Sequence, residues 1–226
     1  SYGRYAHKNS LAFKEGFLQL PLINRWIIEF AATLQKKIPT IHIKRAAFTF
    51  IPTYDIDIAW SYKSKGLLRN IGGFVKSPSL ERMAVLAGLK KDPFDCYEFL
   101  RALHQQYQLD PVYFFLVAPS GSVYDKNISP YHHRMWQLIK RHAKIYRIGL
   151  HPSWKSNEKI ALLIKEKKIL ETAGNTAINR SRQHYIKFSL PETFEHLLEA
   201  GIKDDYSMGY GSINGFRASV AASFYW

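Results

Sequence analysis

Residues 112–117 form an uninterrupted apolar and aromatic run, and Pro111 and Pro119 bound it. A strand without alternating polar residues has to be covered on both faces, which is typical of a parallel sheet flanked by helices. The same order, a short apolar run, then a polar segment, then a helical pattern, occurs several times along the chain. We therefore expect an α/β fold with a parallel sheet or barrel.

The periodicity of apolar residues places the other elements of this fold. The predicted strands cover residues 48–53, 112–117, 145–150, part of 177–188, 202–208 and 216–226. A helix is predicted from Asp92-Pro93 onward, a second from Met135 to His142, and a third between Ser156 and Gly174. His142 completes the apolar stripe of its helix, so we expect it in or beside the core.

The first part of the chain does not follow the strand and helix alternation. Five apolar residues in it share one helical face: Ile23, Trp26, Ile27, Phe30 and Leu34. We expect residues 1–45 to form a helical extension packed on the main domain. Residues 46–226 are expected to form that domain.

Composition excludes several classes of protein. Hydrophobic residues make up 46% of the 226 residues and aromatic residues 15%, which is typical of a packed globular chain and not of a disordered one. No run approaches the roughly 20 apolar residues of a membrane span, and the first residues lack a signal-peptide pattern. Cys96 is the only cysteine, so no intramolecular disulfide is possible. These features favour a cytoplasmic location.

The formal net charge of +14 raises the question of a nucleic-acid partner. Lysine and arginine are spread along the chain, and no nucleic-acid-binding motif is present. We therefore expect no nucleic acid, and keep nucleic-acid binding as a third hypothesis that rests on charge alone. A basic surface would equally attract an anionic glycan or a lipid-linked sugar.

Polar residues follow successive predicted strands. They are Asp55, Asp57, Asp125, His151, Arg182, His184, Asp204 and Asp205. Because the carboxyl ends of parallel strands share one rim, this topology should bring these side chains together. Carboxylates and imidazoles suit a divalent metal, above all zinc. A second carboxylate can then serve as a general base.

Several segments resemble the polysaccharide deacetylases, also called carbohydrate esterase family four or NodB-homology domains. Thr53-Tyr54-Asp55-Ile56-Asp57 resembles the first motif, in the T-x-D-x-D form of a divergent bacterial branch. Residues 112–117 resemble the second strand, Ile148-Gly149-Leu150-His151 resembles the second motif, and residues 179–185 fall where the arginine-bearing third motif belongs. The resemblance covers residues 46–226.

The resemblance implies a distorted (β/α) barrel of about seven strands, a zinc-type metal, and removal of N-acetyl or O-acetyl groups from a bacterial glycan or a lipid-linked or nucleotide-linked sugar. It implies that Asp55 is the general base and that Arg182 orients it. Asp57 and His151 correspond to metal ligands.

The chain also departs from the family pattern. Lys155 stands where a second ligand histidine is usual. Either His184 supplies the missing imidazole from the next strand, or the site is incomplete and the chain is an inactive glycan-binding protein of the same fold. The family's last motif is not present, so we expect the barrel to be truncated at its C-terminus.

Residues near these motifs are candidates for substrate contact: Ser153, Trp154, Asp125, Asp205 and Arg217. Trp154 is expected either to stack on a sugar ring or to pack at the base of a loop. Asp205 and Arg217 would bind substrate or pair with each other, and Asp125 would line the cleft or cap a helix. His132 and His133 are expected to point apart, because adjacent residues of a helix face different directions.

Overall fold

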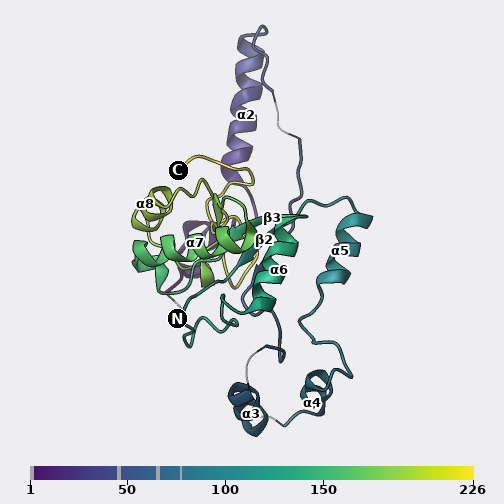
Figure 1. The fold of residues 1–226 in the computed structure, drawn as a ribbon. Coiled ribbons are helices and arrows are strands. Elements are labelled where there is room, and N and C mark those ends of the chain that lie inside the picture. The colour runs from purple at the N-terminus through teal and green to yellow at the C-terminus, as the bar shows by residue number, and fades with distance from the viewer. Residues whose placement is uncertain (1–2, 45–46, 65–66, 77) are drawn as a thin grey trace.

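Five short parallel strands lie at the centre of the protein (Figure 1). The computed structural model describes residues 3–44, 47–64, 67–76 and 78–226. The strands are β1 (Thr53–Ile56), β2 (Val112–Phe115), β3 (Arg147–Leu150), β4 (Arg180–Ser181) and β5 (Asp204–Asp205), and they are arranged in chain order. Every neighbouring pair is parallel. The prediction of an α/β fold with a parallel sheet is therefore confirmed.

The sheet is open, and in the described part of the chain it has five strands, so the expected closed barrel of about seven strands is not found. The run 202–208 contributes only the two-residue strand β5, and no strand forms in 216–226. The backbone of this last segment bonds to the N-terminal part of the chain instead. Phe216 donates to the Leu18 carbonyl, and the Ser219 carbonyl accepts from Ile23.

The first strand begins later than predicted. Residues 48–52 are not in a strand, and 92% of Phe48 is exposed. β1 pairs only with β2, which begins at Val112, and the last bond upstream joins the Val112 N–H to the Pro52 carbonyl. A β-prone run without a partner strand cannot form a ladder. As a result Asp55 lies inside the strand and Asp57 directly after it.

Strand β2 is buried on both faces, as its sequence predicts. All four of its residues are fully buried. Tyr113 and Phe115 point toward His142, with ring centroids 4.7 and 5.5 Å away. Phe114 points to the opposite face, where it meets the guanidinium of Arg182 at 5.0 Å. One face of the sheet thus supports the helical core, and the other supports polar side chains.

Each connection between neighbouring strands ends in a helix: α5 (Tyr97–Gln106) before β2, α6 (His133–Ala143) before β3, α7 (Ile160–Gly174) before β4 and α8 (Glu192–Glu199) before β5. The 3-10 turns η2 (Ser156–Glu158) and η3 (His184–Ile186) precede α7 and α8. Helices α6 and α7 pack against each other and the sheet. The prediction that His142 belongs to the core is confirmed. Its Nδ1 donates to the Leu138 carbonyl at 2.8 Å, and burial lowers its pKa to about 4.

A long excursion between β1 and β2 carries α3 (Leu67–Lys76) and α4 (Leu80–Leu86) away from the sheet (Figure 1). Asp92 was expected to cap a helix, but α5 begins only at Tyr97. The buried Asp92 carboxylate instead accepts the backbone N–H groups of Ser61, Tyr62, Lys63 and Phe94. These bonds anchor the segment that leaves β1.

The N-terminal part contains η1 (His7–Asn9), α1 (Leu11–Lys14) and α2 (Leu22–Lys37). Helix α2 projects from the body at the end opposite to α3 and α4 (Figure 1). Its predicted apolar stripe does not pack on the sheet, since Trp26 and Phe30 are 58% and 64% exposed. The division of the chain at residue 45 remains a prediction. None of the described helices is long and apolar enough to cross a lipid bilayer.

Candidate metal centre

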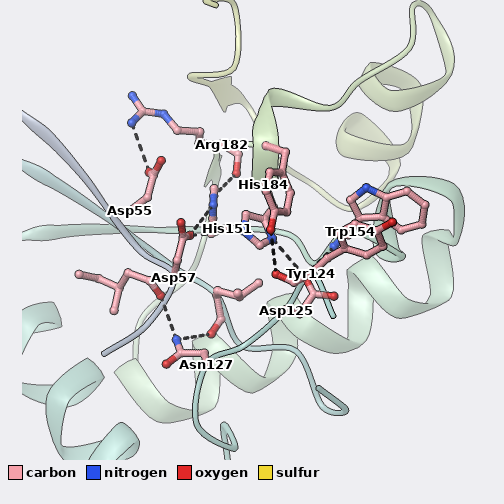
Figure 2. A network of polar contacts seen from close by, with 12 residues as sticks. Asp55, Asp57, Tyr124, Asp125, Asn127, His151, Trp154, Arg182 and His184 are labelled. Atoms are coloured by element: carbon pink, nitrogen blue, oxygen red, sulfur yellow. Dashed lines mark hydrogen bonds and ion pairs between the residues drawn. The ribbon is translucent and has the colours of Figure 1, made fainter. Parts of the chain in front are cut away.

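Three predicted ligands meet at the carboxyl ends of the strands (Figure 2). Asp57 follows β1, His151 follows β3, and His184 begins the η3 turn after β4. One ligand atom of each lies within 4.8 Å of the others. Asp57 Oδ1 is 3.0 Å from His151 Nε2 and 3.7 Å from His184 Nε2. Two imidazole nitrogens therefore face one carboxylate oxygen.

The other nitrogen of each imidazole is held by a hydrogen bond. His151 Nδ1 donates to the Arg182 carbonyl at 2.6 Å, and His184 Nδ1 donates to Asp125 Oδ1 at 3.0 Å (Figure 2). Such bonds place the proton on Nδ1 and direct the lone pair of Nε2 toward the centre. Metal-binding histidines are almost always oriented in this way.

The donor atoms also fit a cation chemically. Asp57 Oδ1 is buried and has no hydrogen-bond partner. It lies 3.0 Å from His151 Nε2, which has no proton to donate when the neutral ring carries its proton on Nδ1. A buried carboxylate oxygen normally has a partner, and a cation between the oxygen and the two nitrogens would be one. One carboxylate and two imidazoles form a common ligand set for catalytic zinc.

The charges at this position favour a cation. Burial opposes ionisation of Asp57, but His151 and His184 outweigh it and hold the pKa of Asp57 below its ordinary value. Burial also opposes protonation of His151, but Asp57 and Asp55 outweigh it and raise the pKa of His151. Asp57 is therefore held in its ionised form, which is the form that binds a cation, and His151 lies beside two carboxylates.

The proposed base and its arginine lie on the sheet face that carries Phe114. Arg182 Nη1 is 3.2 Å from Asp55 Oδ1, and its Nη2 donates to Thr53 Oγ1 at 2.7 Å. Its Nε donates to the Tyr206 carbonyl at 3.2 Å. All three guanidinium nitrogens are thus engaged, so Arg182 fixes the direction of the Asp55 carboxylate. The Asp55 side chain remains 31% exposed, which leaves it accessible to water.

Asp125, which was predicted to contact substrate, lies beside His184 in the structure. Its side chain is buried, and its Oδ1 accepts from His184 and from the Trp154 N–H at 3.0 Å. Ser122 Oγ donates to its Oδ2 at 2.8 Å. Burial opposes its charge, but these bonds lower the pKa of Asp125 below the ordinary value. Asp125 is therefore a support for His184.

Ser153 and Trp154 also differ from the expectation of substrate contact. Ser153 is buried, and its N–H donates to Glu166 Oε2 at 2.9 Å. The indole of Trp154 stacks on Tyr124 with a centroid distance of 4.6 Å, and Lys187 Nζ lies 3.8 Å over the same ring. Packing at the base of a loop, the second of the two expectations for Trp154, describes these contacts better than an open platform for a sugar.

Asp205 and Arg217 lie outside this centre and do not pair with each other. The buried Asp205 carboxylate accepts from the hydroxyls of Ser181 and Ser207, and burial raises its pKa. The Arg217 guanidinium packs over Phe188 at 4.0 Å and lines a separate cavity near the N-terminus. The substrate-binding role expected for both has no support in these contacts.

Two residues that support the centre were not singled out from the sequence as such. Asn127 Nδ2 donates to the carbonyls of Ile56 and Leu116, which ties the exits of β1 and β2 together (Figure 2). The fully buried Glu166 holds the loop after His151 through Ser153, and burial raises its pKa to about 6. A charged residue on the inner face of α7 was the signal that could have identified Glu166.

Lys155 does not take the place of the usual second histidine. It is exposed to solvent, whereas His184 lies at the centre and is buried. Of the two alternatives left open by the sequence, these positions favour the one in which the second imidazole comes from the segment after β4.

Comparisons with known proteins give distant similarities. Residues 1–39 match a family of unknown function (DUF7033). No curated protein matches the sequence. The chain is similar to the crystal structure of a proposed polysaccharide deacetylase from Mycobacterium smegmatis at 14% identity and a TM-score of 0.46, covering 74% of this chain and 57% of that one. It is also similar to IcaB from Ammonifex degensii at 11% identity and a TM-score of 0.42, covering 71% of this chain and 84% of that one.

Proposed function

We propose that the protein is a metal-dependent hydrolase that removes acetyl groups from a bacterial polysaccharide or glycan precursor. The observation that carries this proposal is the convergence of His151 and His184 on the buried, unpartnered oxygen of Asp57. Asp55, fixed by Arg182, lies beside this group. The resemblance of these segments to the deacetylase motifs supports the same reaction.

Each residue has a distinct task in the proposed reaction. Asp57, His151 and His184 would hold a zinc-type ion, which when bound polarises an acetyl carbonyl and lowers the pKa of water. The Asp55 carboxylate takes the proton from the water that attacks the acetyl carbon. The same carboxyl group can return the proton to the leaving nitrogen or oxygen. Arg182 keeps the Asp55 carboxylate oriented for this proton transfer.

The substrate in this proposal is an acetylated glycan or a lipid-linked or nucleotide-linked sugar. The alternative of an inactive glycan-binding protein was based on Lys155, which would leave the centre one imidazole short. With His184 beside Asp57, three donor atoms are present without Lys155. This geometry favours catalysis over binding alone.

The first test is elemental analysis of the zinc-reconstituted protein together with acetate release from acetylated oligosaccharides. We expect one equivalent of zinc in the unmodified chain, and loss of zinc in His184→Ala. His42→Ala removes an exposed histidine outside the centre and should retain the metal.

The proposed base is tested separately. Asp55→Asn should keep zinc and lose about 10²- to 10⁴-fold of the rate of acetate release, the range attributed to general acid–base catalysis. Asp110→Asn, a change at an exposed aspartate on another part of the chain, is the control. Failure to bind zinc, or full activity in Asp55→Asn, would contradict the proposed function.

A further inference from the structure

A second polar site lies near the start of α6, and none of the three metal ligands lines it. An open cavity of about 480 Å³ lies at the surface between the segment after β1, the end of α4 and the start of α6. Its polar lining comes from Lys63, Ser64, His132, His133 and Arg134, and no acidic residue lines it. None of these residues takes part in the proposed hydrolysis.

The cations of this cavity are not neutralised within the protein. Among the residues that the structure describes, no carboxylate lies within 4.0 Å of the Lys63 ammonium or the Arg134 guanidinium. The Asp92 carboxylate binds the backbone N–H of Lys63. Ser64 Oγ is buried and has no hydrogen-bond partner. Two cationic residues and a serine with an unpartnered hydroxyl therefore line one cavity that no acidic residue lines.

The two histidines line the same cavity beside the cationic side chains. They were expected to point apart, but His132 precedes α6 with an extended backbone (ψ 131), and its ring stacks on His133 at 4.7 Å. Burial lowers the pKa of His132, and the positive charges of His133 and Arg134 lower it further. The amino end of α6 contributes partial positive charge in the same direction.

We propose that this cavity binds a phosphate group, with Lys63 and Arg134 as the charged donors. Arginine and lysine are the residues that bind phosphate in proteins, arginine through paired N–H donors and lysine as a point charge. The volume lies within the range of about 300–1,000 Å³ that is typical of small-molecule sites. The cavity therefore has room for the group to which the phosphate is attached, such as a sugar.

This proposal is independent of the acetyl hydrolysis, because it uses none of the metal ligands. The connection between them is spatial: the cavity residues follow β1 and β2, and the metal ligands follow β1, β3 and β4.

The test is isothermal titration calorimetry of the full chain in phosphate-free buffer of low ionic strength. The ligands are inorganic phosphate, N-acetylglucosamine 1-phosphate and uncharged N-acetylglucosamine. We expect one phosphate per chain, and at least tenfold weaker binding in a Lys63→Gln, Arg134→Gln double variant. An Arg25→Gln, Lys203→Gln double variant removes the same charge at exposed positions elsewhere and should bind as the unmodified chain does.

The outcomes separate the possible sources of the phosphate. Tighter binding of the sugar phosphate than of inorganic phosphate would identify a phosphate ester as the ligand, and equal binding would identify the free anion. Absence of phosphate binding, or equal losses in the two double variants, would overturn the proposal, since equal losses reflect net charge alone. Circular dichroism shows whether each variant is folded, and His184→Ala should bind phosphate normally even if the proposed hydrolase function fails.

Discussion

The hydrogen bond between Asp125 and His184 allows the metal centre to be tested without changing a ligand. Asp125 is buried and accepts from three groups: His184 Nδ1, the Trp154 N–H and Ser122 Oγ. Asp125→Asn keeps the shape and the Oδ1 acceptor but removes the charge. Its new amide would also face Ser122 Oγ, which already accepts two backbone N–H groups. Asp125→Ala removes every acceptor.

The expected loss of zinc affinity depends on whether each substitution leaves an acceptor for His184 Nδ1. Loss of a partner that orients a metal ligand typically costs about 10- to 100-fold in metal affinity, which corresponds to about 1.4–2.8 kcal/mol. We expect Asp125→Asn near the lower end, because His184 Nδ1 still has an acceptor. Asp125→Ala should reach the upper end, because the imidazole is then free to turn.

Zinc affinity is measured by competition with a chromophoric chelator at neutral pH. The control is Asp92→Asn, which alters another buried aspartate that binds backbone N–H groups and does not contact the metal ligands. It should lower stability and leave zinc affinity unchanged. Equal zinc affinity in the unmodified chain and Asp125→Ala would refute the reasoning, because His184 would then not depend on Asp125.

Three further predictions concern stability and are checked by urea unfolding. The pKa of His142 is about 4 in the folded protein and about 6.5 when unfolded. The free energy of unfolding should therefore be fully present above pH 6.5 and fall by about 2 kcal/mol at pH 5. His142→Leu should lack this decline, and an identical decline in that variant would contradict the prediction. Asp92→Ala should lower the free energy of unfolding by at least about 3 kcal/mol, because it leaves several backbone N–H groups without an acceptor. A loss below about 1 kcal/mol would argue that Asp92 does not anchor the segment after β1. Gly149→Ala should cost about 1–3 kcal/mol, because its Cβ would lie 2.6 Å from Phe114 and 3.1 Å from the Arg180 carbonyl; Gly72→Ala, with nothing within 4 Å, is the control.

The sequence predicted those parts of the fold that depend on local pattern. The uninterrupted apolar run at 112–117 required cover on both faces, and β2 is fully buried. The polar residues after successive strands required a common rim, and Asp57, His151 and His184 meet there although no local spacing groups them. Both inferences used only strand direction and burial, which sequence patterns encode well.

The errors arose where a segment's partner decides its structure. Residues 48–52 and 216–226 have β-prone sequences, but neither finds a neighbouring strand, and a strand needs one. The same reason applies to substrate contacts. Ser153 and Asp125 were placed correctly on the rim, but the sequence could not show that Glu166 and His184 lie against them. Whether a rim residue faces solvent or supports a neighbour depends on contacts distant in the chain.

The position of His184 after β4 is accompanied by an unusual backbone. A histidine four residues after His151 would follow on the same loop, whereas His184 must be turned back toward the centre from the end of β4. The chain makes this turn with Tyr185 and Ile186 at φ values of 60° and 54°, in the left-handed region. Such a conformation costs roughly 1–3 kcal/mol per residue and persists only where surrounding contacts enforce it.

Two contacts meet that requirement. The Ile186 N–H donates to the Gln183 carbonyl at 2.8 Å, and Tyr185 Oη donates to the Tyr124 carbonyl at 3.2 Å. Tyr124 is the residue directly before Asp125, so the segment that holds the strained turn also carries the carboxylate that orients His184. A tight turn, a supporting tyrosine and a buried aspartate therefore form one unit. Together they hold His184 Nε2 beside Asp57 Oδ1.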